Sequence, residues 1–566
     1  MSIPIDPACK DWFDKSEKSI PKGKYLFDRK EIYQVPMKDG TKLSTAVYFP
    51  RGGSNWPVLF TRNPYAQNKP LLEAVYLPLL SHGYCIVIQD CRGTGRSEGV
   101  WEPFINERDD GIDSLEWLSK QPWIDGNIAT FGRSYSCFTQ WIVADSLPEQ
   151  VKTMFLEVYG VDRYRQVYMN GMFREDIYTS WAFANSGVKS SQTTGELYKQ
   201  AIEILPAEDR DTKLLGQKLP FYQNYISEVS EDSPYWCDSI WQILKTMPEK
   251  ITVPVVITDG WADHHLDGSI QGFEQLRPQV KNESKLIIGP WDHLGNTTGD
   301  LDYPDSDAFG FMNLKAHLDW FDFKLKGKGH GIDSKVYVIG AKKWHSIGDW
   351  PPAADPQKLF LSEGQRLKEA PSGENVSFQY NPQKPLTAPG GSALLAWITP
   401  GFTELPHGIV RQPDYTSRDD VLLFSTEPLK KPVTLLGKAK VDLFVSSSAE
   451  DTSFFVRLIE KKPDGSSYNI TDGISSLSYR NNAVKPKSYS PGEKIKVSIT
   501  LWDSAWQFDK GSQIELLISS SNFPMYSVHS NKKGPWAKQT KNSDIAKQTI
   551  FFGLTGSKLI LPLAKN

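Results

Sequence analysis

A serine, an aspartate and a histidine, each close behind an apolar run, give this sequence its clearest chemistry. Ser134 follows the run at 128–131 and precedes a segment with helical spacing of apolar residues. Asp263 and His293 follow similar runs further along the chain. A serine hydroxyl needs a base to take its proton, and the base needs an orienting carboxylate. The order Ser, Asp, His therefore predicts acyl transfer, with Ser134 as nucleophile, Asp263 as orienting acid and His293 as base.

A second serine fits the G-x-S-x-G pattern more closely. Residues 95–99 read Gly-Arg-Ser-Glu-Gly, whereas the turn at 132–136 ends in serine instead of glycine. The first segment is followed by a proline and no immediate helical pattern, and the second by a helical one. Because the motif requires a strand, a sharp turn and a helix, we predict that Ser134 is the nucleophile and that Ser97 lies in a loop.

The elements that must position these residues alternate between strands and helices. Continuous apolar runs such as 84–88 indicate the buried strands of a parallel sheet. A helical pattern lies at 110–118, and a last one ends this region at 313–325. The alternation predicts an α/β fold, an α/β-hydrolase domain in two parts at residues 1–145 and 246–350.

Two further regions differ from this alternating pattern. Residues 146–245 are rich in Tyr, Trp, Met and helix formers, which predicts a helical cap inserted over the site. Residues 351–566 contain short alternating strands and turns such as Pro-Asp-Gly at 463–465, which predicts a C-terminal β-sandwich of the jelly-roll type. The sandwich shows no periodic aromatic ladder, so we expect it to wall the active site rather than to bind glycans.

Composition excludes several classes of protein. The 566 residues have a net charge of −3, which gives no electrostatic case for binding nucleic acid or an anionic membrane. No apolar run is long enough to span a bilayer, and no signal peptide is visible. Five scattered cysteines fit buried thiols in a reducing compartment. We therefore expect a cytoplasmic protein, and a homo-oligomeric state stays open.

Six motifs occur in a fixed order along the chain. They lie at 61–65, 90–99, 121–126, 132–135, 260–263 and 289–293, and the C-terminal region adds 451–458 and 463–465. Together they resemble the bacterial cocaine esterase and X-Pro dipeptidyl-peptidase family of serine α/β-hydrolases, also described as CocE/NonD-type hydrolases. The resemblance implies a hydrolase domain, a helical cap and a C-terminal jelly roll, in agreement with the patterns above.

The resemblance also assigns roles to single residues. The nucleophile, acid and base of the family map onto Ser134, Asp263 and His293. The oxyanion hole is similar to one formed by the Tyr65 hydroxyl and the backbone N–H of Tyr135. Both groups are hydrogen-bond donors suited to a developing negative charge.

A metal site is the alternative interpretation of the loop after the acid. Asp263, His264, His265 and Asp267 all offer ligand atoms, but their spacing matches no common zinc arrangement. The glycines at 93–99 lack the register of a nucleotide-binding loop. We therefore expect neither a metal nor a cofactor.

The substrate is predicted from the absence of acidic residues near the catalytic acid. In the α-amino-acid ester hydrolases of the group that this chain resembles, a W-D-Q-E-D pattern surrounds the catalytic acid, and its extra carboxylates hold the substrate ammonium. Here the matching residues 261–266 read Trp-Ala-Asp-His-His-Leu. A buried ammonium without a counter-charge is costly. Trp101, Trp261 and Trp291 flank the motifs and favour a bulky neutral or aromatic acyl group.

We accordingly predict a serine hydrolase of small-molecule carboxylic esters. Two alternatives stay open. One is an X-Pro dipeptidyl-peptidase or amidase that uses the same three residues on an amide. The other is a non-catalytic protein on a hydrolase scaffold, with the sandwich binding carbohydrate.

Overall fold

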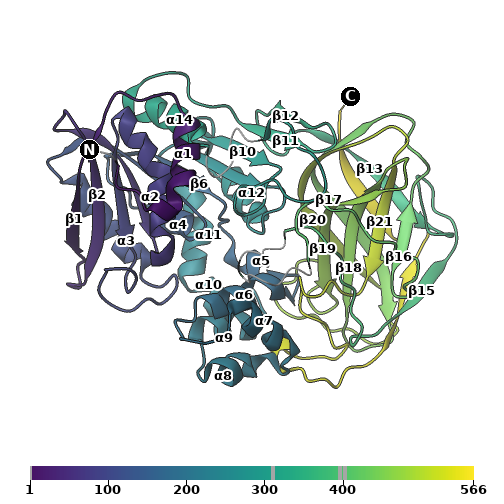
Figure 1. Ribbon diagram of the computed structural model, residues 1–566. Helices are drawn as coiled ribbons and strands as arrows, with labels where there is room; N and C mark the ends of the chain where they lie inside the picture. The colour runs from purple at the N-terminus through teal and green to yellow at the C-terminus, as the bar shows by residue number, and fades with distance from the viewer. Residues whose placement is uncertain (1–2, 307–312, 393–397, 399–404, 566) are drawn as a thin grey trace.

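The computed structural model describes residues 3–306, 313–392, 398 and 405–565. Figure 1 shows an N-terminal part that contains a sheet with helices on its faces, and a C-terminal part built of strands. A group of short helices lies below the junction of the two parts in this view.

The N-terminal part is organised around a ten-stranded sheet in which the strands from β4 to β11 run parallel. Antiparallel strands flank this parallel core on both sides. Every position of β3, β4 and β9 is buried, as expected for a parallel sheet covered on both faces. In spatial order the strands are β1 (Phe27–Pro36), β2 (Lys42–Pro50), β4 (Cys85–Asp90), β3 (Trp56–Asn63), β5 (Ile124–Arg133), β6 (Val151–Glu157), β9 (Val255–Gly260), β10 (Lys285–Gly289), β11 (Lys335–Val338) and β12 (Lys343–Ser346).

Helices of this part supply the apolar side chains that cover the sheet. Trp320 and Phe321 of α14 are fully buried and belong to the same core cluster as Phe131 of β5. On another surface of the sheet, Phe138 of α4 packs in a second cluster with Val58 of β3. The helices are α1 (Lys10–Lys18), α2 (Lys69–Tyr76), α3 (Glu107–Ser119), α4 (Tyr135–Trp141), α12 (Leu266–Glu274), α13 (Pro278–Lys281) and α14 (Lys315–Lys326).

The region predicted as a helical cap contains one strand of the central sheet. Strand β6 lies inside the range 146–245 and pairs with β5 and β9. Its apolar run is short, and such a run does not distinguish a strand from a buried helix by periodicity. The rest of the range is mainly helical, with α5 (Arg163–Val167), α6 (Glu175–Ala184), α7 (Thr194–Glu203), α8 (Arg210–Leu215), α9 (Pro220–Ser227), α10 (Pro234–Cys237), α11 (Ile240–Lys250) and a small hairpin of β7 (Tyr168–Met169) and β8 (Met172–Phe173).

The C-terminal part contains an eleven-stranded antiparallel arrangement with one short parallel pair. Its longest pairing joins β17 and β20, whose alternating buried positions give the apolar core. The strands are β13 (Ala354–Ser362), β14 (Arg366–Lys368), β15 (Asn375–Tyr380), β16 (Leu422–Ser425), β17 (Val433–Ser447), β18 (Ser453–Lys461), β19 (Ser467–Ser476), β20 (Ile495–Phe508), β21 (Gln513–Ser519), β22 (Ala546–Phe551) and β23 (Lys558–Ala564).

Backbone hydrogen bonds and an ion pair join the two parts. Ile339, just after β11, donates its N–H to the Ala505 carbonyl at 2.9 Å and accepts from the Gln507 N–H at 2.8 Å. Lys438 of β17 reaches Asp267 of α12 at 2.5 Å. The C-terminal domain therefore contacts α12, the helix that follows the predicted catalytic acid Asp263.

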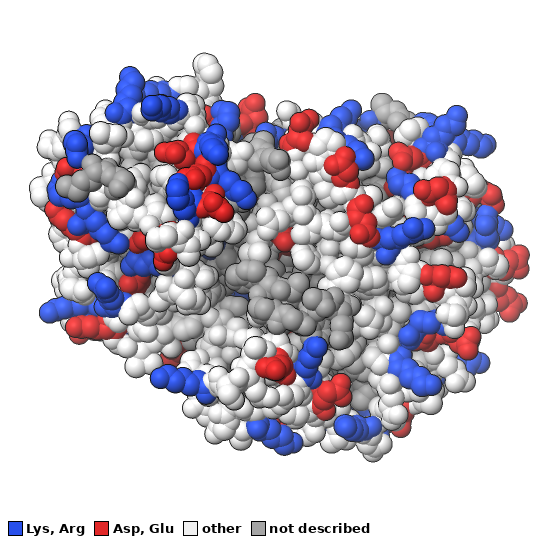
Figure 2. All heavy atoms as spheres, viewed as in Figure 1, with Lys and Arg blue, Asp and Glu red and all other residues white. Residues whose placement is uncertain are grey.

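The surface carries both signs of charge. In the view of Figure 2, Lys and Arg side chains alternate with Asp and Glu side chains over both parts of the molecule. Among the residues that the structure describes, no helix has the length and apolar character required to cross a bilayer.

Candidate active site

Ser134 lies in a sharp turn between β5 and α4. It is the residue before the first turn of α4, and its backbone angles are φ 53° and ψ −124°, a strained conformation for a residue with a side chain. Two residues earlier, Gly132 has φ 146°, and a Cβ there would lie 2.7 Å from the Ser136 Cβ and 2.9 Å from the Thr61 hydroxyl. Glycine is therefore required at this position, and the tight turn directs Ser134 out of the sheet edge.

The structure brings the three residues predicted for acyl transfer together. The Nε2 of His293 lies 2.9 Å from Ser134 Oγ, and its Nδ1 lies 2.9 Å from Asp263 Oδ2. All three follow the carboxyl ends of parallel strands, where ligand sites of open α/β sheets form. The other oxygen of Asp263 accepts the backbone N–H of His265 at 2.8 Å, which fixes the carboxylate. A serine, an imidazole and a carboxylate in this chain of contacts can carry out nucleophilic catalysis.

The carboxylate of Asp263 is held in its charged form. Burial alone raises its pKa, but the His293 charge and the hydrogen bonds from His264 and His293 outweigh burial and leave the pKa well below its ordinary value. Asp259 on β9 has the opposite shift, because burial and the nearby Asp263 charge raise its pKa well above the ordinary range. One carboxylate is thus ionised beside the imidazole, and its neighbour keeps its proton.

The predicted oxyanion donors line the same cavity as Ser134. Tyr65 follows β3, and its hydroxyl accepts a hydrogen bond from the Trp181 indole at 3.2 Å. Burial raises the Tyr65 pKa to about 12, against smaller opposing effects of Trp181 and Arg163, so the hydroxyl keeps the proton it would donate. Tyr135 is the first residue of α4, where backbone N–H groups have no partner within the helix.

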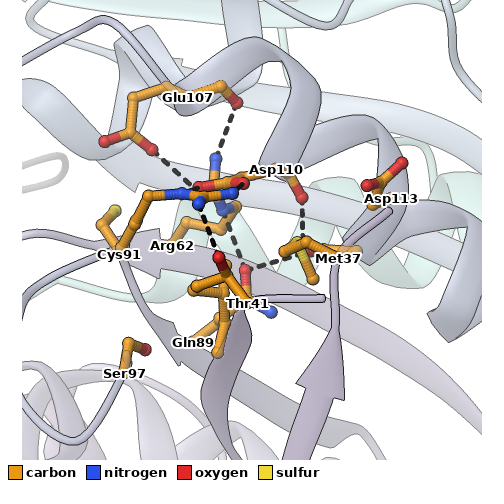
Figure 3. Close-up of polar contacts among 12 residues, drawn as sticks. Met37, Thr41, Arg62, Gln89, Cys91, Ser97, Glu107, Asp110 and Asp113 are labelled. Atoms are coloured by element: carbon orange, nitrogen blue, oxygen red, sulfur yellow. Dashed lines mark hydrogen bonds and ion pairs between the residues drawn. The ribbon is translucent and has the colours of Figure 1, made fainter. Parts of the chain in front are cut away.

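Ser97 lies in a loop and serves a structural hydrogen-bond network. Its hydroxyl donates to the Asp90 carbonyl at 2.7 Å and accepts from the Ser44 N–H at 2.9 Å. Figure 3 shows Ser97 below a cluster of polar side chains around Arg62, which lies near the carboxyl end of β3. Its hydrogen bonds are to backbone groups and not to an imidazole, so its surroundings differ from those of Ser134.

The two histidines after Asp263 are buried and uncharged. Burial lowers the pKa of His264 to about 3, and burial, with a smaller contribution from the adjacent His264, lowers the pKa of His265 well below 6.5. Ligand atoms of His264, His265 and His293 lie within 4.8 Å of one another, the single such group among the described residues. Both ring nitrogens of His293 already contact Asp263 and Ser134, so a metal here would compete with those contacts. Asp267, the fourth residue considered, pairs with Lys438 instead.

The cavity in front of Ser134 has a volume of about 400 Å³ and an aromatic wall. Of the three tryptophans singled out in the sequence, Trp101 lies behind this wall, with its ring 6.0 Å from that of Tyr135. Trp261 and Trp291 pack elsewhere, against Trp350 and Trp344. The aromatic residues that line the cavity are Trp12, Tyr65, Phe104, Tyr135, Tyr159, Tyr178 and Trp181.

Several of these lining residues were not found from the sequence. Phe104 has φ 74°, Trp181 lies on the cap, and Arg163 begins α5. None of them belongs to a motif with a fixed spacing from Ser134. The aromatic richness of the cap was the only sign of Trp181, and no pattern pointed to Arg163.

Comparisons with known proteins agree with this geometry. Residues 39–295 match the sequence model of the X-Pro dipeptidyl-peptidase (S15 family), and residues 330–556 match that of the X-Pro dipeptidyl-peptidase C-terminal non-catalytic domain. The cocaine esterase of Rhodococcus sp. (strain MB1 Bresler) is 28% identical over 577 residues, which cover 94% of this chain and 98% of that protein. The chain belongs to the cocaine esterase and X-Pro dipeptidyl-peptidase family. As a member of this family it is a serine hydrolase.

Solved structures confirm the predicted fold. An aminopeptidase from the marine sediment archaeon Thaumarchaeota archaeon superimposes with a TM-score of 0.82 at 22% identity, covering 96% of this chain and 98% of that one. An α-amino acid ester hydrolase superimposes with a TM-score of 0.80 at 22% identity, covering 96% and 97%. This chain therefore has an α/β-hydrolase domain followed by a sheet-rich C-terminal domain.

Proposed function

We propose that the protein hydrolyses small-molecule carboxylic esters through an acyl-enzyme at Ser134. The observation that supports this most directly is the continuous chain of contacts from Ser134 through His293 to Asp263, with both distances at 2.9 Å. The similarity of this chain to the cocaine esterase of Rhodococcus supports an ester as the substrate.

The reaction proceeds in two acyl-transfer steps. His293 takes the proton of Ser134, and the alkoxide attacks the ester carbonyl to form a tetrahedral oxyanion. The Tyr65 hydroxyl and the Tyr135 N–H stabilise this oxyanion. The C–O bond to the alcohol then breaks, and His293 returns the proton to the leaving alcohol. In the second step His293 takes a proton from water, the hydroxide attacks the acyl-enzyme, and collapse releases the acid and restores Ser134.

The aromatic wall favours a substrate with a flat apolar body. Phe104, Tyr159 and Trp181 offer ring faces and edges within a cavity large enough for an aryl group. This supports the predicted bulky or aromatic acyl group, although the residues concerned are not the tryptophans named from the sequence.

Replacement of Ser134 tests the proposed function. Ser134→Ala should abolish turnover of a 4-nitrophenyl ester and labelling by a fluorophosphonate. Ser97→Ala, which changes the serine of the other G-x-S-x-G segment, is the matched control and should keep both. Near-normal turnover by Ser134→Ala would refute the proposal, and a catalytically inert wild type that fails to label would favour the non-catalytic carbohydrate-binding alternative.

A dipeptidyl-peptidase or amidase is the second candidate, because the S15 family model covers residues 39–295. A dipeptide substrate brings a free ammonium, yet the described residues that line the cavity include no Asp or Glu to pair with it. Comparison of Xaa-Pro anilides with aryl esters decides between the two candidates. Faster cleavage of the anilides, relative to their uncatalysed rates, would favour the peptidase.

The remaining features predicted from the sequence are part of the proposal. We keep the division into 1–145, 146–245, 246–350 and 351–566, with β6 counted in the hydrolase domain, and the jelly-roll assignment of the last range. Three of the five cysteines (Cys85, Cys91 and Cys137) are buried thiols, which supports a reducing, cytoplasmic location. We also keep the prediction that the protein acts without nucleic acid, membranes, metals or cofactors. Whether it forms a homo-oligomer stays open.

A further inference from the structure

Arg163 is a buried cation in the wall of the active-site cavity. It is the first residue of α5 and is 4% exposed. Its Nε and Nη2 donate to the Tyr225 hydroxyl at 3.2 and 2.9 Å, and its Nη1 donates to Gln166 Oε1 at 3.2 Å and to the Tyr178 hydroxyl at 3.4 Å. Each of these acceptors is a neutral oxygen, so the hydrogen bonds do not compensate the charge.

The other buried arginines of the cap have carboxylate partners. Arg174 lies 3.1 Å from Asp176, and Arg210 lies 2.7 Å from Glu175. Within the described part of the chain, Arg163 has no carboxylate oxygen within 4.0 Å. A guanidinium does not lose its proton in a protein, and a buried unpaired charge is costly.

Aromatic rings surround the guanidinium and compensate part of this cost. Its central carbon lies 4.6 Å from the ring centre of Tyr178, 5.0 Å from that of Phe104 and 5.2 Å from that of Tyr225. Such cation–π contacts contribute less than a desolvated ion pair does. The rings therefore compensate the charge of Arg163 only in part.

The cavity shared with Ser134 is positively charged. Among its described lining residues, the charged side chains are Arg133 and Arg163, and none is Asp or Glu. Arg133 is paired with Glu157 at 3.1 Å. Of the two arginines that line the cavity, Arg163 is therefore the one to which the described residues supply no carboxylate. It lines the cavity together with Tyr159, Tyr178 and His265.

We propose that Arg163 binds a carboxylate of the substrate, so that the preferred esters carry a negative charge in addition to the scissile ester group. This inference rests on the proposed ester hydrolysis and specifies its substrate class. Four of the five guanidinium N–H groups donate to Tyr225, Gln166 and Tyr178, so the substrate carboxylate takes the remaining N–H on Nη2 or replaces the Tyr225 hydroxyl. The surrounding rings accept the apolar body of the same molecule. A carboxylate on the acyl side would replace the neutral acyl group predicted from the sequence, whereas a carboxylate on the alcohol side leaves that prediction unchanged.

Pairs of esters in which a free carboxylate is replaced by its methyl ester test the proposal, with each rate taken relative to the uncatalysed rate of the same ester bond. The acyl side is tested by the 4-nitrophenyl monoester of glutaric acid against 4-nitrophenyl methyl glutarate. The alcohol side is tested by 4-carboxyphenyl butyrate against its methyl ester. We expect the wild type to prefer the anionic member of one pair by about tenfold to 100-fold in kcat/KM, the range of a charge-assisted hydrogen bond.

Variants separate recognition from a structural role. Arg163→Met should abolish the preference for the anionic ester, mainly through KM, so that kcat/KM falls at least tenfold more for the anionic ester than for the neutral one. Arg163→Lys keeps the positive charge but replaces the planar guanidinium with an ammonium group, and it should retain part of the preference for the anionic ester. Arg165→Met, which changes an arginine on the same helix with a side chain 49% exposed, is the control and should retain all of it.

The outcomes distinguish this inference from the proposed function. Equal losses for charged and neutral esters in Arg163→Met, or a wild type that prefers neither anionic ester, would overturn the role of Arg163 and leave ester hydrolysis in place. Absence of Ser134-dependent hydrolysis of every ester would overturn both. If Arg163→Met does not fold, the wild type alone decides: competitive inhibition by glutarate but not by glutaramide is expected, and equal inhibition would contradict the proposal.

Discussion

The hydroxyl of Tyr135 donates to the Glu107 carboxylate at 3.0 Å, so the residue after Ser134 is fixed by a buried anion. The same hydroxyl accepts the N–H of Phe104 at 2.7 Å. Glu107 in turn lies 3.0 Å from the Arg62 guanidinium, within the polar cluster of Figure 3. The amide proposed for the oxyanion hole is thereby connected to α3 and to a side chain that lines the cavity.

Tyr135→Phe should lower stability and catalysis together. The change leaves the Phe104 N–H without its acceptor and removes one of the groups that pair with Glu107, and an unsatisfied buried polar group costs about 1–3 kcal/mol. We expect this loss in the free energy of unfolding in urea. We also expect a several-fold fall in kcat, because the turn at Ser134 is less firmly held. Tyr164→Phe, which removes a phenol hydrogen bond to the Val229 carbonyl in the cap, is the control and should leave kcat unchanged. Unaltered stability and kcat in Tyr135→Phe would contradict the anchoring role.

Tyr65→Phe should reduce kcat by roughly 10²–10³-fold, the usual effect of removing one oxyanion donor. KM should change little, because the hydroxyl acts on charge that develops after binding. Trp181→Phe keeps an aromatic ring in the cavity wall but removes the indole N–H that donates to Tyr65, and it should have a much smaller effect on kcat. Steady-state kinetics with one aryl ester measure both variants, and a Tyr65→Phe enzyme with normal kcat would exclude this hydroxyl from the reaction.

The pattern of strands was sufficient to predict how Ser134, Asp263 and His293 meet. Each follows a buried parallel strand, and the carboxyl ends of such strands share one edge of the sheet. Tyr65 was identified only through the family resemblance, since a tyrosine at a strand end has no distinctive spacing.

Features that depend on packing between distant elements were not predictable in this way. Among the described residues, Arg163 contacts Tyr178 of α6 and Tyr225 of α9 and no carboxylate, an arrangement that no local sequence pattern records. Trp261 and Trp291 lie beside the motifs in sequence, but their rings pack away from the cavity. Nearness in sequence was therefore a poor guide to which aromatic residues form the wall.

Acid should destabilise the protein partly through His264. Burial lowers its folded pKa to about 3, whereas an unfolded histidine titrates near 6.5. Between these values the unfolded chain binds a proton that the folded chain does not, so the free energy of unfolding falls as the pH decreases from about 6.5 toward 3. His264→Gln should flatten this dependence, and His265, shifted in the same direction, should preserve part of it. Urea unfolding between about pH 4 and pH 7 measures the slope, and identical slopes for variant and wild type would refute the assignment.

Lys438 holds two carboxylates at the junction of the domains. Its ammonium lies 2.5 Å from Asp267 of α12 and 3.5 Å from Asp503 of β20. Burial raises the pKa of Asp503 to about 6 even with the Lys438 charge nearby, which lowers it. Removal of the ammonium leaves both carboxylates in a poorly solvated place.

Lys438→Met should therefore destabilise the protein by about 1.5–3 kcal/mol at neutral pH. The value lies below that of a fully buried pair, because the Lys438 side chain is 29% exposed. The loss should shrink at acid pH. Asp503 has a raised folded pKa, so the folded state takes up a proton there at a higher pH than the unfolded state does, and the part of the cost that comes from Asp503 disappears once it is protonated. Lys440→Met, two residues along β17 and 43% exposed, is the control and should change stability by less than about 1 kcal/mol. A loss for Lys438→Met that is independent of pH would show that packing, and not the charge of Asp503, dominates this junction.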